Sequence, residues 1–320
     1  MNYSIVLYIL GCVLKFESAF LVLPALVGLI YREHASVSYL AVAVLCLILG
    51  VLLTHKKPRS TNLYTREGFV AVALSWIIMS IFGAIPFVLT GDIPFYVDAL
   101  FETISGFTTT GSISKASLFW RSFSHWIGGM GVFVFIMAIL PMMGGSTMNL
   151  MKAESPGPSV SKLVPHVKDT AKILYGIYIA ITICEATILR ALGMPLFDSL
   201  TTTFGTVGTG GFGIRNDSIA GYSPAIQITI TVFMILSGIN YTAYFYILTG
   251  KIKELFKIEE VRWYLAIIFG SVAVITWNVR SLYPTFSETL RHAFFQVGSI
   301  ITTTGYATTD FDLLYLKLCW

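Results

Sequence analysis

The sequence predicts an all-α polytopic membrane protein in which one structural unit is repeated. Of its 320 residues, 55% are hydrophobic and only 12% are charged, which is typical of membrane proteins and excludes an ordinary soluble domain. Long apolar runs recur along the chain, each about as long as a membrane-spanning helix. Short Thr/Gly-rich segments lie between several of these runs and align with one another.

The apolar runs predict seven membrane spans. A helix needs about 20 mostly apolar residues to cross the hydrocarbon core. The runs cover residues 3–30, 37–54, 68–90, 122–143, 171–192, 223–249 and 261–280. The segments after the third, fifth and seventh runs are too polar to span the bilayer and too apolar for ordinary loops.

The basic residues predict the orientation of these spans, because cytoplasmic loops carry an excess of Lys and Arg. Three alternate loops are rich in them: Lys56, Lys57, Arg59 and Arg66; Lys152, Lys162, Lys168 and Lys172; Lys251, Lys253, Lys257 and Arg262. The intervening loops hold fewer: Arg32; Lys115 and Arg121; Arg190 and Arg215; Arg280 and Arg291. The first set is therefore expected in the cytoplasm, and the short polar segments are expected to enter the membrane from outside.

Three segments align without gaps and define the repeat. They read VDALFETISGFTTTGS, FDSLTTTFGTVGTGGF and RHAFFQVGSIITTTGY. Two aligned columns hold small residues, namely Gly111, Gly211 and Gly305, and, six positions earlier, Ser105, Gly205 and Ser299. Each copy is read as a span, a half-helix, a polar turn and a second span.

Such a turn suits a cation. Non-helical backbone at membrane depth is tolerated only where protein or a water-filled cavity surrounds it. Its carbonyl groups can replace the hydration shell of a cation, and the half-helix directs the negative end of its dipole inward. Glycine permits the backbone conformations required, and threonine adds a hydroxyl without a charge. A single TTTG is more typical of a linker or a turn; three aligned copies favour an ion pathway.

Acidic residues in the half-helices have two interpretations. Asp98 and Asp198 coincide thirteen positions before the aligned glycines. They are read as helix-start residues that satisfy free N–H groups, with an effect on the surface potential as the alternative. Glu102 is expected to pair with a neighbouring repeat, but the sequence does not identify the partner.

Charged residues inside the spans are the remaining candidates for chemistry. Glu185 lies in the middle of the fifth run and is read as forming an interhelical hydrogen bond, with a proton relay as the alternative. Lys15 and Glu17 in the first run are expected to neutralise each other or to reach the interface.

The sequence gives no sign of a metal centre, a disulfide or an enzyme. Cys12, Cys46, Cys184 and Cys319 are widely spaced and are read as packing residues. The histidines lack ligand spacing, and no acids, histidines or nucleophiles converge in the spans. The basic residues do not form a run that would indicate nucleic-acid binding.

Several motifs in order resemble the Trk/Ktr/HKT superfamily of potassium transporters, and within it the TrkH type. They are SGFTTTGS, SHWIGGMG, AESPGP followed by DTAKILYGIY, GTVGTGGFG, TVFMILSGINY and TTTGYATTDFD. The resemblance implies four joined pore repeats around one filter, preceded by two extra helices, in a dimeric protein of the bacterial inner membrane. It also implies a cytosolic TrkA-type ring that binds nucleotides and gates the pore.

The resemblance assigns the filter and the domains. K⁺ would bind at Thr109, Thr110, Gly111, Thr209, Gly210, Gly211, Thr303, Thr304 and Gly305, with no other cofactor in this chain. Glycine in all three repeats implies potassium rather than sodium. The extra helices would occupy residues 1–60, the first repeat 61–150, the second 151–255 and an incomplete third 256–320.

The end of the sequence departs from the family pattern. The resemblance stops near DFDLLYLKLCW, before the exit span of the third repeat and the whole fourth repeat. We interpret this as a truncated or frame-shifted product. A non-conducting or regulatory membrane subunit is the alternative function; a membrane enzyme is disfavoured because it would require converging catalytic groups.

Overall fold

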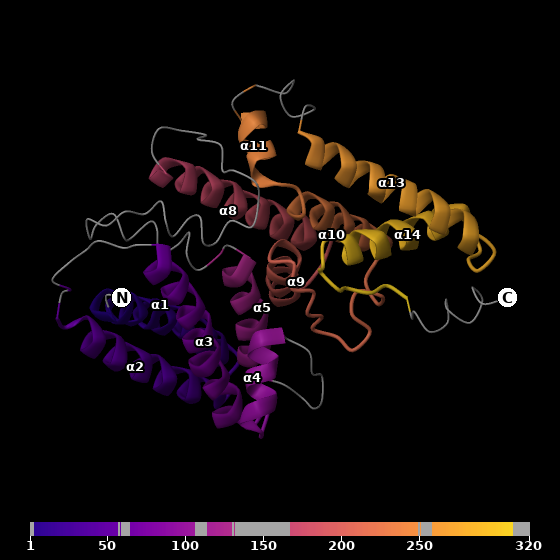
Figure 1. Cartoon of the computed structure of the whole chain (residues 1–320). Helices are drawn as coiled ribbons and strands as arrows, with labels where there is room; N and C mark the ends of the chain where they lie inside the picture. Colours follow the sequence, from indigo (N-terminus) through magenta and orange to yellow (C-terminus); the bar gives the residue numbers. More distant parts are fainter. Residues whose placement is uncertain are drawn as a thin grey trace. The chain divides into compact units, whose positions relative to one another are not determined.

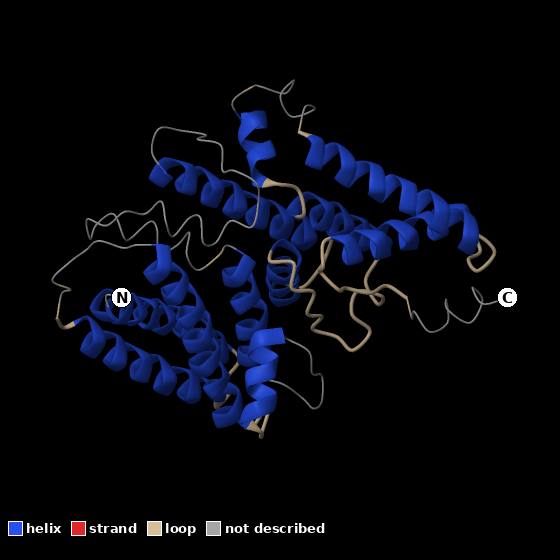
Figure 2. Cartoon of the chain, in the orientation of Figure 1, coloured by secondary structure: helices blue, strands red, loops and turns tan. Residues whose placement is uncertain are grey.

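A computed structural model describes residues 3–56, 58, 65–105, 114–129, 131, 167–248, 250 and 258–309. Within these ranges every regular element is a helix, as predicted (Figures 1 and 2). The chain forms two compact units, Met1–Lys172 and Ile173–Trp320, and each is described by itself.

The first unit is built around an α-helical hairpin. Its helices are α1 (Tyr3–Ile30), α2 (Ala35–Thr54), α3 (Thr65–Thr90), α4 (Tyr96–Ser105) and α5 (Lys115–Gly129). Helix α1 packs against α2, α3 and α5, and α3 packs against α4. The Tyr39 hydroxyl of α2 is buried and donates to Ser117 Oγ of α5 at 2.9 Å. This bond ties the hairpin to the helix that follows the first Thr/Gly segment.

Two glycines explain why α1 and α2 pack so closely. A Cβ at Gly11 would lie 2.8 Å from Leu53 Cβ, and a Cβ at Gly50 would lie 2.8 Å from the Gly11 carbonyl oxygen. Small residues are the usual device that lets helix backbones approach in lipid. The two N-terminal helices therefore form a tight pair.

The second unit contains the other two Thr/Gly segments. Its helices are α8 (Val167–Ala191, from Ile173 onward in this unit), α9 (Leu196–Val207), α10 (Pro224–Ser237), α11 (Tyr241–Leu248), α13 (Glu259–Val279) and α14 (Phe286–Ile301). Helix α10 packs against both α9 and α14, and α13 packs against α14. The half-helices α9 and α14 thus share α10 as a neighbour. The core around them includes the buried side chains of Leu189, Met194, Ile230, Met234 and Phe295.

Five of the predicted spans are helices long and apolar enough to cross a membrane. They cover Tyr3–Ile30, Ala35–Thr54, Val70–Thr90, Ile173–Ala191 and Glu259–Val279. Helix α5 covers the start of the predicted span 122–143, whose residues 130 and 132–150 lie outside the described part.

The predicted continuous span at 223–249 is wrong. Helix α10 ends at Ser237, and α11 begins at Tyr241. Between them the Gly238 N–H still bonds the Met234 carbonyl, but the Ile239 N–H bonds the Leu236 carbonyl in a tighter turn. A Cβ at Gly238 would lie 2.8 Å from Thr302 Cγ2, so the interruption is also a point of close approach to the third Thr/Gly segment. Hydropathy does not detect such a break, because both halves are apolar.

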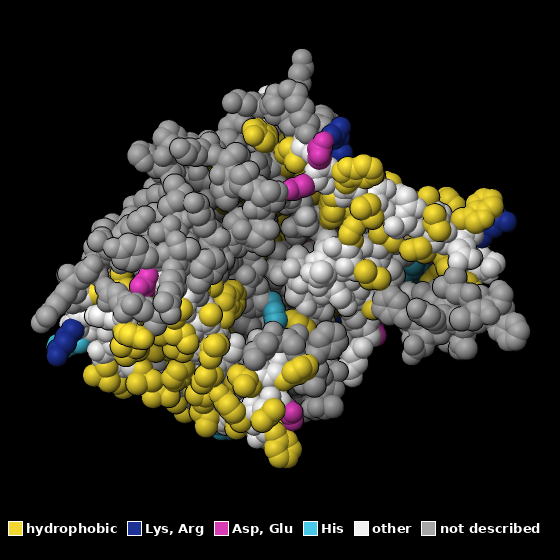
Figure 3. Space-filling model, viewed as in Figure 1, with side chains coloured by type: hydrophobic (Ala, Val, Ile, Leu, Met, Phe, Trp, Pro, Cys, Tyr) yellow, Lys and Arg dark blue, Asp and Glu magenta, His cyan; other side chains and the backbone are white. Residues whose placement is uncertain are grey.

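Hydrophobic side chains are exposed on the long helices, as a bilayer environment requires. They gather over α2 in the first unit and along α13 in the second (Figure 3). Exposed examples are Val44, Ile48 and Leu52 on α2, and Phe269 and Val274 on α13. Lipid-facing helix surfaces are apolar because hydrocarbon cannot solvate polar groups.

Candidate functional site

Helix α9 ends in a compact turn, residues 208–211, called turn 2 here. The Gly210 and Gly211 N–H groups both donate to the Gly205 carbonyl, at 2.8 and 3.2 Å. Two hydrogen bonds to one carbonyl oxygen are a common arrangement at helix C-termini, and here they satisfy the last turn of α9.

Helix α14 ends in the same way at residues 302–305, called turn 3. The Thr304 and Gly305 N–H groups both donate to the Ser299 carbonyl, at 2.9 and 3.3 Å. These atoms occupy the positions that the sequence alignment pairs with those of turn 2. The second and third copies therefore each end in a turn with the same pattern of backbone hydrogen bonds.

The backbone angles of the two turns also match. Thr209 and Thr303 have φ of 53° and 58°, and Gly211 and Gly305 have φ of 67° and 88°. Glycine adopts positive φ readily, but a β-branched residue does so only where its surroundings impose it. Strained backbone at threonine in both copies is the kind of local outlier that accumulates at functional sites.

Turns 2 and 3 meet inside the second unit. A Cβ at Gly211 would overlap the Thr304 carbonyl oxygen, so the backbones of the two turns are in contact at this point. Gly305, by contrast, has no atom within 4 Å of an ideal Cβ. Gly211 is therefore required both for its φ and for the space, whereas Gly305 is required for its φ alone.

This geometry gives the turns a definite chemistry. Their N–H groups point back to the helices that they terminate, so they are not available to an anion. What remains at the turns are carbonyl oxygens and threonine hydroxyls, which are hard, uncharged ligands for a cation. The C-terminal ends of α9 and α14 add partial negative charge at the same place.

The filter residues predicted in the first copy, Thr109, Thr110 and Gly111, lie outside the described part of the chain.

Two carboxylates hold the start of helix α5, which follows the first Thr/Gly segment. Asp92 accepts from the Ser114 N–H and hydroxyl at 3.2 and 2.6 Å. Glu33, between α1 and α2, accepts from the Lys115 and Ala116 N–H groups at 2.9 and 3.1 Å. Sequence reasoning missed Glu33, because its partner lies 82 residues away in the chain.

The acidic residues at the half-helix starts lie where predicted, in the first turns of α4 and α9. The Asp98 side chain is exposed. Among the described residues Asp198 bonds no backbone N–H; its carboxylate accepts from the Tyr222 hydroxyl at 2.9 Å and lies 3.9 Å from Arg215 Nη2. It therefore links α9 to the loop that follows turn 2.

Glu102 pairs within its own repeat, so the expected pairing with a neighbouring repeat is wrong. Its Oε1 lies 3.3 Å from Arg121 Nη1 of α5, with both side chains buried. The loop position predicted for Arg121 is wrong, because Arg121 lies within helix α5 and its guanidinium is buried. The pair connects the first half-helix with the helix that follows its Thr/Gly segment.

The other intramembrane acids behave differently from the predictions. Glu17 is fully buried, and neither carboxyl oxygen has a hydrogen-bond partner in the described chain; it does not pair with Lys15. Glu185 is fully buried on α8 and faces the Thr206 hydroxyl of α9. That hydroxyl donates to the Thr202 carbonyl at 2.9 Å, and neither Glu185 oxygen accepts a bond of ordinary geometry among the described residues.

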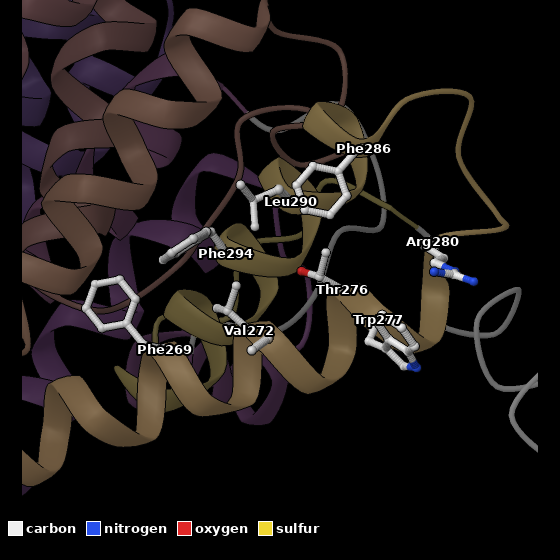
Figure 4. A pocket seen from close by; sticks show the side chains of 9 residues that line it. Phe269, Val272, Thr276, Trp277, Arg280, Phe286, Leu290 and Phe294 are labelled. Atoms are coloured by element: carbon white, nitrogen blue, oxygen red, sulfur yellow. The ribbon is translucent and has the colours of Figure 1, made fainter.

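An apolar groove of about 440 Å³ lies between α13 and α14. Side chains of Val272 and Thr276 face Leu290 and Phe286 across it (Figure 4). Its lining suits hydrocarbon rather than an ion. Within the described residues, no group of three or more His, Cys, Asp or Glu side chains is placed to hold a metal, and Cys12, Cys46 and Cys184 are free.

The sequence profile of the TrkH family, described as "Cation transport protein", matches residues 35–315. The chain belongs to the TrkH family. It is 36% identical to the "Trk system potassium uptake protein TrkH" of Salmonella typhimurium, and the match covers 96% of this chain and 67% of that protein. An "Uncharacterized cation transporter" of Methanocaldococcus jannaschii is 30% identical over 95% of this chain and 63% of its own length.

The fold comparison agrees with the family assignment. A crystal structure of "the Potassium Transporter TrkH from Vibrio parahaemolyticus" superposes with a TM-score of 0.82 at 30% identity, covering 100% of this chain and 69% of that one. This chain thus spans about two thirds of the length of its TrkH relatives. It is a multi-span membrane protein of a transport family, not an enzyme.

Proposed function

We propose that this protein takes up potassium through a filter of backbone carbonyls, in which turns 2 and 3 supply two of the ion-binding segments. The single observation that carries the proposal is the shared geometry of these turns. In both turns, N–H groups at aligned positions donate to the preceding helix, and aligned residues have positive φ. TrkH relatives named for potassium uptake support the choice of ion.

The proposed ion-binding residues are those assigned from the sequence. In turns 2 and 3 they are Thr209, Gly210, Gly211, Thr303, Thr304 and Gly305. The equivalent segment of the first copy would be Thr109, Thr110 and Gly111. Permeation needs no covalent chemistry: a dehydrated ion passes the carbonyls, driven by a potential worth about 2.3 kcal/mol per elementary charge per 100 mV.

We further propose that the protein acts as a homodimer in the bacterial inner membrane and is gated by a TrkA-type cytosolic ring that binds nucleotides. The support is the Trk system named for its bacterial relatives, together with five helices able to span a bilayer. Cross-linking in isolated inner membranes, followed by affinity capture of a tagged cytosolic ring, tests this assembly. Recovery of a monomer alone would contradict it.

The transport proposal is tested with the full chain reconstituted in liposomes. We expect K⁺ flux down an imposed gradient that exceeds Na⁺ flux. Gly211→Arg should abolish it, since its side chain would occupy the contact with Thr304. Gly270→Ala on α13 is the control, because a Cβ there meets no atom within 4 Å. Absence of flux from the unaltered chain would overturn the proposal and favour a non-conducting or regulatory subunit.

A further inference from the structure

Tyr306 directly follows turn 3 and ties it to the half-helix that ends in turn 2. Its side chain is buried, and its hydroxyl donates to the Thr202 carbonyl of α9 at 3.1 Å. Its own carbonyl accepts from the Ser299 hydroxyl of α14 at 2.6 Å. The residue that directly follows turn 3 is therefore held by both half-helices.

The column of small residues in the alignment is explained by this contact. A Cβ at Gly205 would overlap the Tyr306 hydroxyl. The aligned residue in the third copy, Ser299, instead uses its hydroxyl to hold the Tyr306 carbonyl. Gly205 also supplies the carbonyl that accepts both N–H groups of turn 2. The Tyr306 hydroxyl thus lies against the helical turn that fixes turn 2.

A second connection joins the segments that leave the two turns. The Ile219 N–H donates to the Ala307 carbonyl at 3.1 Å, and the Ala307 N–H donates to Ser218 Oγ at 3.2 Å. Ser218 has φ of 53°, a conformation that a residue with a Cβ adopts only where it is held. Turns 2 and 3, with the segments that follow them, are therefore connected at three points: the Tyr306 hydroxyl bond, the bonds between residues 218–219 and Ala307, and the close approach of Gly211 to Thr304.

We propose that Tyr306 is a specificity-determining positioning residue, which sets the separation of turns 2 and 3 and thereby the preference for K⁺ over Na⁺. This inference rests on the proposed function. Whether a carbonyl filter selects by cavity size or by the number of carbonyls that reach the ion, the supporting residues must hold those carbonyls in place. Tyr306 touches no ion in this role; it acts through α9 and turn 3.

Tyr306→Phe is the test, because it removes only the hydroxyl that bonds Thr202. Tyr264→Phe is a matched control: the Tyr264 hydroxyl of α13 also donates to a backbone carbonyl of another helix, Ile235 on α10, at 3.0 Å. Gly238 lies beside it as Gly205 lies beside Tyr306. Each variant loses one hydroxyl bond to the main chain in the same unit. Tyr306 directly follows turn 3 and bonds the half-helix that ends in turn 2, whereas Tyr264 bonds α10 and approaches turn 3 only by way of Gly238.

In liposomes we expect Tyr306→Phe to lower the K⁺/Na⁺ permeability ratio by about 2- to 10-fold, the effect of losing one hydrogen bond. Tyr264→Phe should leave the ratio unchanged even if it lowers the melting temperature equally. Ser218→Ala, which removes the hydroxyl bond of the second connection and leaves its backbone bond, should lower the ratio in the same direction. An unchanged ratio in Tyr306→Phe, or an equal fall in Tyr264→Phe, would overturn the assignment while leaving the transport proposal intact.

A second readout does not need flux. We expect K⁺ to raise the melting temperature of the unaltered protein more than Na⁺ does, and Tyr306→Phe to reduce this difference while Tyr264→Phe retains it. If Tyr306→Phe fails to fold, Gly205→Ala, whose Cβ would displace the Tyr306 hydroxyl, tests the same contact by the same measurement. If the unaltered protein shows neither flux nor a difference between the ions, the proposed function itself fails.

Discussion

The Glu102 carboxylate and the Arg121 guanidinium form an ion pair at 3.3 Å, with 1% and 3% of their side chains exposed. The pair joins α4 to α5 on either side of the first Thr/Gly segment. Removing one partner of a buried pair leaves an uncompensated charge. The contact is therefore a sensitive point of the first unit.

Glu102→Gln should lower the free energy of unfolding by about 3–5 kcal/mol, because Arg121 would stay buried and charged. The double variant Glu102→Gln/Arg121→Gln should lose less than the sum of the two single variants. Unfolding in SDS titrations of detergent-solubilised protein measures all three. Strict additivity would show that the two side chains do not stabilise each other.

Glu33→Ala should destabilise the start of α5. The carboxylate accepts two N–H groups of the first turn and places a negative charge at a helix N-terminus, so we expect a loss of about 1 kcal/mol. Glu259→Gln is the control, because that carboxylate is 81% exposed and lies 3.8 Å from Arg262. Exposed pairs of this kind contribute little. Equal losses in the two variants would contradict the capping role.

Alanine at the two turn glycines should have unequal effects on uptake. Gly211→Ala must displace the Thr304 carbonyl as well as adopt positive φ, whereas Gly305→Ala meets only the φ requirement. We expect uptake to be lost in Gly211→Ala and reduced in Gly305→Ala, measured as initial rates normalised to membrane-inserted protein. If Gly305→Ala lowered the uptake rate more than Gly211→Ala did, the result would contradict the close approach of turns 2 and 3.

His292 on α14 should make stability depend on pH. Burial, and then the charge of Arg291, lower its pKa from the ordinary value of 6.5, while Glu288 acts in the opposite direction. Its ring stacks on Tyr283, and Nδ1 lies 2.9 Å from Thr308 Oγ1. Because the folded state favours the neutral ring, its contribution to stability is full above pH 6.5 and is lost as the pH falls through the lowered pKa.

The measurement for His292 is the unfolding free energy between pH 8 and pH 5. His292→Gln, which cannot titrate, should show a shallower decline over this range than the unaltered protein. The comparison isolates one histidine, since the remaining four are common to both proteins. Parallel curves would show that His292 titrates alike in the folded and unfolded chain.

The sequence alone was sufficient for the features that repeat or that follow composition. Hydropathy located five long helices because a bilayer selects for length and apolar character. The ungapped alignment paired Gly205 with Ser299 and Gly211 with Gly305, and these pairs occupy equivalent positions in the same backbone turn. Both signals are local, so neither needs knowledge of how distant segments pack.

Contacts between distant segments required the tertiary structure. Nothing near Glu102 in the sequence distinguishes Arg121 from other basic residues, and Glu33 and its N–H partners are separated by three helices. The break between α10 and α11 escapes a hydropathy scan because apolar residues continue through it. The alignment also showed that position 205 must be small, but only the fold supplied the reason: the Tyr306 hydroxyl, 101 residues further along the chain, fills the space that a Cβ would need.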